Sequence, residues 1–111
     1  MGFTRFYHQY SKWKKSDWDK FIKKINSLKI HFEEFYNCNI IIFGDRLIVE
    51  DTSENKAGDL RIYKEQREHM LDKNNVQFNF VKTNYNPYDT VCDFILRLAH
   101  DQKRDFTYTS D

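Results

Sequence analysis

The segment SDWDKFIKKINSLKIHFEEFY, residues 16–36, has the clearest pattern in the chain and decides the fold prediction. Its apolar residues recur every three or four positions, as they do on one face of an α-helix. They are Trp18, Phe21, Ile22, Ile25, Leu28, Phe32, Phe35 and Tyr36. Ser16 is suited to cap the first turn, and Asp17 and Asp19 place negative charge at the positive end of the helix dipole. The segment therefore predicts an amphipathic helix from about Ser16 to Tyr36.

A second helix is predicted near the end of the chain. Asn86-Pro87 is typical of a helix start, because asparagine caps free amides and proline at the first helical position loses no hydrogen bond. Apolar residues with helical spacing follow as far as about Gln102. They are Tyr88, Val91, Cys92, Ile95, Leu98 and Ala99.

Short strands are predicted on both sides of the first helix. Residues 2–10 are rich in aromatic side chains and lack helical spacing. Residues 39–43 and 46–50 are joined by Gly44-Asp45, which suits a hairpin with a primed turn because glycine accepts a positive φ. Residues 60–63 are a further candidate strand.

The segments between these strands are polar. Residues 51–59 carry almost nothing to bury, so we expect an exposed loop tip where disorder concentrates. Residues 64–75 are charged and fit either a loop or a weak helix.

Two further strands are predicted from alternation. In residues 76–82, Val76, Phe78 and Phe80 alternate with polar residues, which predicts a strand that buries its apolar face. Phe106 and Tyr108 alternate with threonines in a final strand.

The order of these elements predicts a single α+β domain over residues 1–111. Two helices and several strands fit a two-layer sandwich, with both helices on one face of a mainly antiparallel four- to six-stranded sheet. We expect the first and last strands beside the strand at 76–82. A strand–helix–strand unit makes the last two strands parallel through a right-handed crossover.

Composition limits the choice of partners. Eighteen Lys and Arg against 17 Asp and Glu leave a net charge of +1, so no global field attracts nucleic acid or an anionic membrane. The longest apolar run, residues 40–43, is far too short to span a bilayer, and no signal segment opens the chain. We therefore expect a cytoplasmic protein without a membrane partner. Cys38 and Cys92 lack metal-type spacing and are expected to be free, buried thiols.

Four short motifs occur in order along the chain: Gly2-Phe3-Thr4-Arg5-Phe6-Tyr7, FNFVKT at 78–83, Pro87-Tyr88-Asp89 and Ser110-Asp111. In these motifs the chain resembles an uncharacterised family of small proteins from bacteria, phages and large DNA viruses. The family has a Gly-aromatic-Thr-basic-aromatic opening strand, a Lys-Thr…Pro-Tyr-Asp motif and a closing Ser-Asp-Gly, of which the glycine is missing here. The resemblance implies a mobile-element context and marks the motif residues as functional positions, but it implies no activity.

The sequence contains no recognised catalytic motif. Its histidines are dispersed, and it has no glycine-rich phosphate loop, serine elbow or CxxC pair. We therefore assign no catalytic residue, no metal and no cofactor, and we favour a role other than that of an enzyme.

The first candidate site is a ligand- or partner-binding cluster of Arg5, His8, Lys82, Thr83, Tyr88 and Asp89. Lys82 and Asp89 lie where a strand ends and a helix begins, and amides and the helix dipole can bind an anion at such a place. Arg5 and His8 join this surface if the opening strand is adjacent. The alternative is a structural role, in which Asp89 stabilises the helix dipole.

The second candidate site is a basic and aromatic surface made of Lys12, Trp13, Lys14, Lys15, Lys20, Lys23 and Lys24. Cations beside an aromatic ring can hold phosphates and stack a base, as in proteins that bind single-stranded nucleic acid. The alternative is a solvated helix face, because Asp17 and Asp19 dilute the positive charge.

These observations support three hypotheses, in order of preference. The first is a small phage-type interaction protein that binds a host or defence complex stoichiometrically in the host cytoplasm and inhibits a defence system such as CRISPR. The second is an RNA- or nucleotide-binding module that uses the basic surface or Lys82. The third is a small nuclease or phosphodiesterase built from Arg5, His8, Lys82 and Asp89.

Overall fold

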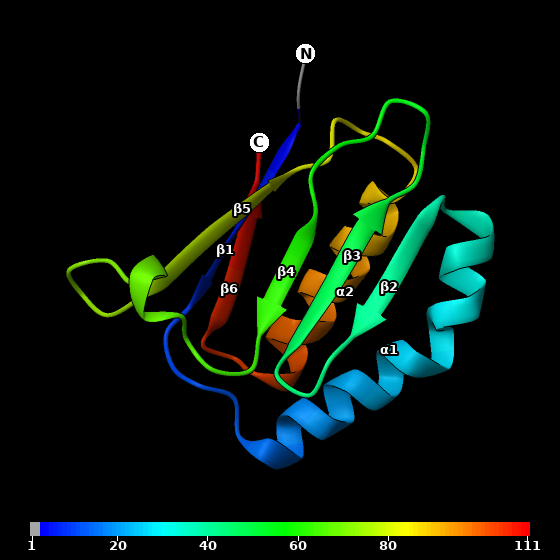
Figure 1. The fold of residues 1–111 in the computed structure, drawn as a ribbon. Coiled ribbons are helices and arrows are strands. Elements are labelled where there is room, and N and C mark those ends of the chain that lie inside the picture. The colour runs from blue at the N-terminus through cyan, green and yellow to red at the C-terminus, as the bar shows by residue number, and fades with distance from the viewer. Residues whose placement is uncertain (1–2) are drawn as a thin grey trace.

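The computed structural model describes residues 3–111, which form two α-helices, six β-strands and one short 3-10 helix (Figure 1). The helices are α1 (Lys15–Phe35) and α2 (Asp89–Gln102). The strands are β1 (Thr4–Gln9), β2 (Cys38–Ile42), β3 (Arg46–Asp51), β4 (Leu60–Tyr63), β5 (Gln77–Lys82) and β6 (Phe106–Ser110). Gly2, which we expected in the opening strand, lies outside the described residues. No helix in the described part is both long and apolar enough to cross a membrane.

The strands form two antiparallel sheets, with the orders β5-β1-β6 and β2-β3-β4. The predicted α+β class, with two helices and at most six strands, is confirmed. The six strands are divided between two sheets instead of forming one. β1 lies beside β5 as predicted, but β6 pairs with β1 and not with β5. Since both outer strands are antiparallel to β1, β5 and β6 run in the same direction, as expected for a strand–helix–strand unit.

β4 is an outer strand of its sheet, and no further strand within residues 3–111 pairs with its free edge. Side chains from other elements make hydrogen bonds there instead. The hydroxyl of Tyr7, on β1, donates to the carbonyl of Arg61 at 2.8 Å and accepts from the Arg61 amide at 3.3 Å. The hydroxyl of Tyr88 donates to the carbonyl of Gly58, just before β4. The Gly58 amide in turn donates to the carbonyl of Lys82 at 3.1 Å. We call the side of the β5-β1-β6 sheet that carries Arg5, Tyr7 and Gln9 its inner face. This face is turned towards α2 and the edge of β4.

Both helices and both sheets contribute to one core. The predicted stripe of α1 is confirmed at its buried residues, which are Trp18, Phe21, Ile25 and Phe32, although Phe35 is exposed. In α2 the buried residues are Val91, Cys92, Ile95, Leu96 and Ala99. The predicted cap of α1 is wrong, because Lys14 occupies the cap position without a side-chain hydrogen bond and Ser16 lies inside the first turn.

The start of α2 also differs from the prediction. Tyr88 holds the cap position, and Asn86 uses its side-chain amide elsewhere, donating to Asp51 at 2.7 Å and to the carbonyl of Asn55 at 2.8 Å. Asp51 is fully buried, and its carboxylate also accepts from the amides of Ser53 and Ala57, at 2.9 and 2.8 Å. Residues 52 and 54–56 are exposed, as expected for a loop tip. The segment is nevertheless organised around the buried carboxylate of Asp51, which was not expected.

The hairpin of β2 and β3 is confirmed, and the Phe43 amide donates to the Arg46 carbonyl at 2.9 Å to close it. The primed-turn prediction is wrong, because no glycine in the described part has a positive φ. The segment 64–75 is a loop with a single 3-10 turn at Glu68–Met70.

Candidate binding surface

β5 forms as predicted but buries the opposite face. Gln77 and Val81 are buried, whereas Phe78 and Phe80 are 40% and 49% exposed. The prediction that these two phenylalanines face the core is therefore wrong. The side-chain oxygen of Gln77 accepts a hydrogen bond from the Arg67 amide. Gln77 can therefore be buried, because a polar group that has a hydrogen-bond partner is buried at little cost.

β1 adds two aromatic rings to the same exposed side. The strand register places Phe6 opposite Phe80 and His8 opposite Phe78. Ring centroids lie 6.1 Å apart for Phe6 and Phe78, 5.1 Å for His8 and Phe78, and 6.3 Å for Phe78 and Phe80. Tyr10, directly after β1, lies 6.4 Å from His8. We call Phe6, His8, Tyr10, Phe78 and Phe80 the outer aromatic face.

Few charges accompany the outer aromatic face. On β6, Thr107 and Thr109 are the register partners of His8 and Phe6. On β5, alternation places Lys82 on the same side as Phe78 and Phe80. This side of the sheet therefore offers apolar area to a partner, together with a single cation on its strands.

The first candidate cluster is divided by the sheet. Arg5 points to the inner side, where its guanidinium donates twice to Asp89, at 2.7 and 2.8 Å, and once to Asp93 at 3.0 Å. Thr83 donates to the same Asp89 carboxylate at 2.5 Å. Burial raises the pKa of Asp89, but the hydrogen bonds from Arg5 and Thr83 outweigh it and hold the pKa below its ordinary value. The arrangement ties β1 to the start of α2.

The other members of that cluster lie apart from this ion pair. Tyr88 is fully buried in the core, and burial raises its pKa. His8 and Lys82 lie on the outer side of the sheet, separated from Arg5 by the alternation of the strands. The six predicted residues therefore belong to two sides of one sheet.

In the second candidate surface the lysines are exposed, but the tryptophan ring is not. Trp13 is buried, and its ring stacks on Phe21 with a centroid distance of 4.8 Å. It is not available to stack a base. The six lysines of the surface are exposed, and Lys15 pairs with Asp19 at 2.8 Å.

The two cysteines are free and buried, as predicted. Burial raises the pKa of Cys38 to about 11 and also raises that of Cys92. Neither thiol is therefore a thiolate at neutral pH, and the thiolate is the nucleophilic form. Within residues 3–111, no group of three or more His, Cys, Asp or Glu is placed to hold a metal ion.

Sequence reasoning missed most of the outer aromatic face. Only His8 was among the predicted site residues, because the rings of β5 were expected in the core. The available signal was in residues 2–10, where Phe6 and His8 share a side opposite to Arg5 and Tyr7. Assigning that side to solvent requires the partners of Arg5 and Tyr7, which lie on distant elements.

Comparisons with known proteins add no assignment. No family model matches the chain, and searches of curated proteins and of solved structures found no significant match.

Proposed function

We propose that this protein acts by stoichiometric binding and docks a protein partner on the outer aromatic face. The observation that carries the proposal is the exposure of Phe78 and Phe80 on a strand that buries Gln77. Large contiguous apolar patches on monomeric proteins often mark sites of interaction, whereas single exposed apolar residues do not. The rings in question contact each other across β1 and β5 and are free to contact a partner.

A protein partner fits this face better than nucleic acid does. Aromatic residues are enriched and charged residues are depleted in the centres of protein interfaces. Nucleic acid is held mainly through its phosphates, and each phosphate contact needs a cation or another donor. Lys82 is the single strand-borne cation on this side. An RNA-binding role, in which the rings stack bases, is therefore the alternative outcome of the test.

The proposed partner is a host or defence complex. This narrower part of the proposal rests on the resemblance to small proteins of phages and their hosts, and it includes inhibition of a defence system such as CRISPR. The two free thiols suit the reducing cytoplasm in which such a complex acts.

The test is affinity capture with three immobilised proteins: the wild type, the variant Phe78→Thr/Phe80→Thr and a matched control, Ile30→Gln/Phe35→Gln. The control removes two exposed apolar side chains from α1, away from the outer aromatic face. A partner retained by the wild type and the control, but lost by the face variant, supports the proposal. A partner that the face variant retains at full yield overturns it.

Salt dependence separates the two kinds of partner. A complex with nucleic acid that uses 6–10 phosphates weakens about 10³- to 10⁵-fold between roughly 50 and 200 mM salt. A protein complex on an apolar face should change little over this range. Strong salt dependence, together with loss of the captured material after nuclease treatment, would replace the protein partner by RNA.

A further inference from the structure

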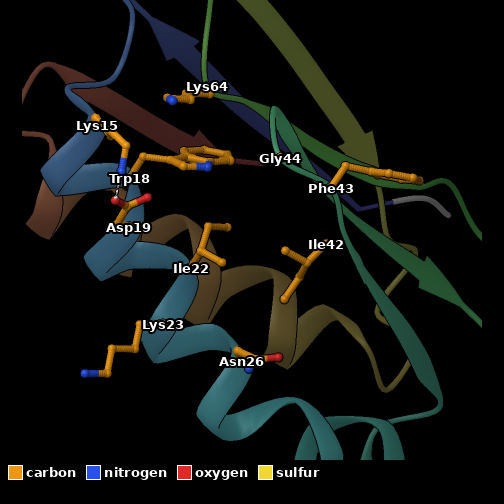
Figure 2. A pocket seen from close by; sticks show the side chains of 10 residues that line it. All are labelled: Lys15, Trp18, Asp19, Ile22, Lys23, Asn26, Ile42, Phe43, Gly44 and Lys64. Carbon is orange, nitrogen blue, oxygen red and sulfur yellow. Dashed lines mark hydrogen bonds and ion pairs between the residues drawn. The ribbon is translucent and has the colours of Figure 1, made fainter.

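A second surface lies between α1 and the hairpin of β2 and β3. In the second half of α1, the carboxylate of Glu33 accepts a hydrogen bond from the Ile40 amide of β2 at 2.8 Å, so helix and strand are in contact there. The first half of α1 is separated from the hairpin by an open groove of about 750 Å³ (Figure 2).

The groove has apolar walls. Trp18 and Ile22 line it from the helix, and Ile42 and Phe43 line it from the hairpin. Figure 2 shows Ile22 and Ile42 on opposite sides of the groove, with the Trp18 ring extending from the helix towards Gly44. Phe43 lies at the hairpin end of the groove and is an exposed large apolar residue, and the Arg46 guanidinium lies over its ring, 4.0 Å from the centroid.

The charged residues around the groove are mainly cationic. Lys15, Lys23 and Lys64 line it together with Asp19, which leaves a net charge of +2. Lys15 is paired with Asp19 at 2.8 Å. Within residues 3–111, neither Lys23 nor Lys64 has an ion-pair partner. Two cations are therefore available to carboxylates from outside.

The edge of β2 adds backbone hydrogen-bonding groups. β2 is an outer strand of its sheet. The Phe43 amide donates to the carbonyl of Arg46, towards β3. In an antiparallel ladder, neighbouring residues of a strand direct their amide and carbonyl groups to opposite sides. Ile42 therefore points these groups away from β3. Ile40 has the same orientation, as its bond to Glu33 shows.

We propose that this groove binds an extended acidic segment of a partner protein. The segment pairs with the backbone of Ile42 at the edge of β2, places an apolar side chain between Ile22 and Ile42, and brings carboxylates to Lys23 and Lys64. Addition of a strand to a free sheet edge is a common way to bind a linear peptide, and opposite charges select the partner. Because Glu33 occupies the amide of Ile40, pairing is confined to the hairpin end of β2. This site is separate from the outer aromatic face and does not depend on it.

The test is selection from a displayed library of random twelve-residue peptides on the immobilised wild-type protein. We expect enrichment of sequences in which Asp or Glu alternates with apolar residues. A synthetic peptide of the enriched sequence should bind about tenfold or more weakly to Lys23→Glu/Lys64→Glu, because two charge-assisted contacts become repulsive. In an amide NMR titration, the same peptide should shift the signals of Ile42 and Gly44.

The matched control is Lys20→Glu/Lys24→Glu, which makes the same charge change on exposed positions of α1 that do not line the groove. Thermal melting establishes that both variants are folded. Phe43→Ser removes apolar contact without any change of charge and should also weaken the peptide. Failure to enrich peptides, enrichment without acidic residues, or equal loss of binding in the two double variants overturns the proposal.

Discussion

The two faces of the β5-β1-β6 sheet each mix polar and apolar side chains. The inner face buries Tyr7, Val81 and Phe106. The inner face takes Arg5 and Gln77, and each has a defined partner: Asp89 for the guanidinium and the Arg67 amide for the side-chain oxygen. The outer face takes phenylalanine rings that contact one another. Burial in this sheet therefore does not follow polarity alone, because a polar side chain that has a hydrogen-bond partner can also lie on the inner face.

This difference separates stability from binding. The inner face connects the sheet to α2 through Arg5 and to β4 through Tyr7, so changes there should lower the free energy of unfolding. Tyr10, Phe78 and Phe80 of the outer aromatic face are exposed, so changes there should affect a partner more than the fold.

The largest effect is expected from Arg5→Met. Removal of one partner of a buried ion pair costs about 3–5 kcal/mol, because the remaining charge stays buried without compensation. The Arg5 and Asp89 side chains retain 12% and 15% exposure, so we expect the lower end, about 3 kcal/mol, in urea unfolding at neutral pH.

The double variant Arg5→Met/Asp89→Leu tests whether the loss of stability comes from the uncompensated charge of Asp89. Replacement of both charges by apolar groups should recover part of the loss, since no isolated carboxylate remains. If Arg5→Met costs less than about 1 kcal/mol, which is the value for exposed ion pairs, the inner face does not depend on this contact.

A smaller effect is expected from Tyr7→Phe. The hydroxyl bonds to both the amide and the carbonyl of Arg61, and its loss leaves both groups at the edge of β4 without this partner. Leaving a buried polar group unsatisfied costs about 1–3 kcal/mol, and these groups are only partly buried, so we expect the lower end, about 1 kcal/mol. Tyr10→Phe is the control, because Tyr10 is exposed on the outer aromatic face and should change the unfolding free energy by less than about 0.5 kcal/mol. Equal effects in both variants would contradict the difference between the faces.

Acid should weaken the contact between Arg5 and Asp89 on the inner side of the sheet. The pKa of Asp89 and the pKa of Asp51 are both below the ordinary value of 3.8, so in that range the unfolded chain binds more protons than the folded one. The stability they contribute is present above roughly pH 5 and is lost as the pH falls through the folded-state pKa values. The difference in unfolding free energy between wild type and Arg5→Met should therefore shrink from pH 7 to pH 3. A constant difference would mean that Arg5 does not act on the ionised Asp89.

The sequence predicted those features that depend on neighbours along the chain. Helical spacing located the buried stripe of α1, and the short connection at Gly44-Asp45 located the hairpin. Alternation located β5, but alternation is the same whichever face is buried. Gln77, on the buried face, accepts a hydrogen bond from the Arg67 amide, and Arg67 belongs to the segment 64–75, for which the sequence fitted either a loop or a helix.

The same limit applies to the site residues. Asn86 has the properties of a helix cap, yet it bonds to Asp51, which lies 35 positions away in the chain. The Arg5–Asp89 contact joins residues 84 positions apart, and no local pattern distinguishes this ion pair from an anion-binding site. Both assignments needed the arrangement of β1, β3 and α2 in space.

The smallest effect on stability is expected on the outer aromatic face, from Phe80→Thr. Threonine is also a good strand former, and cross-strand aromatic pairs contribute roughly 0.2–1 kcal/mol, so the unfolding free energy should fall by about 1 kcal/mol or less. Urea unfolding of the monomer at two protein concentrations measures this value. A loss above about 2 kcal/mol, the scale of a buried side chain, would show that Phe80 is covered in the folded protein. If that loss also grew with protein concentration, the cover would be a second copy of the chain, since only an association depends on concentration in this way. A small loss of stability together with loss of the captured partner would instead show that this face is used for binding and not for folding.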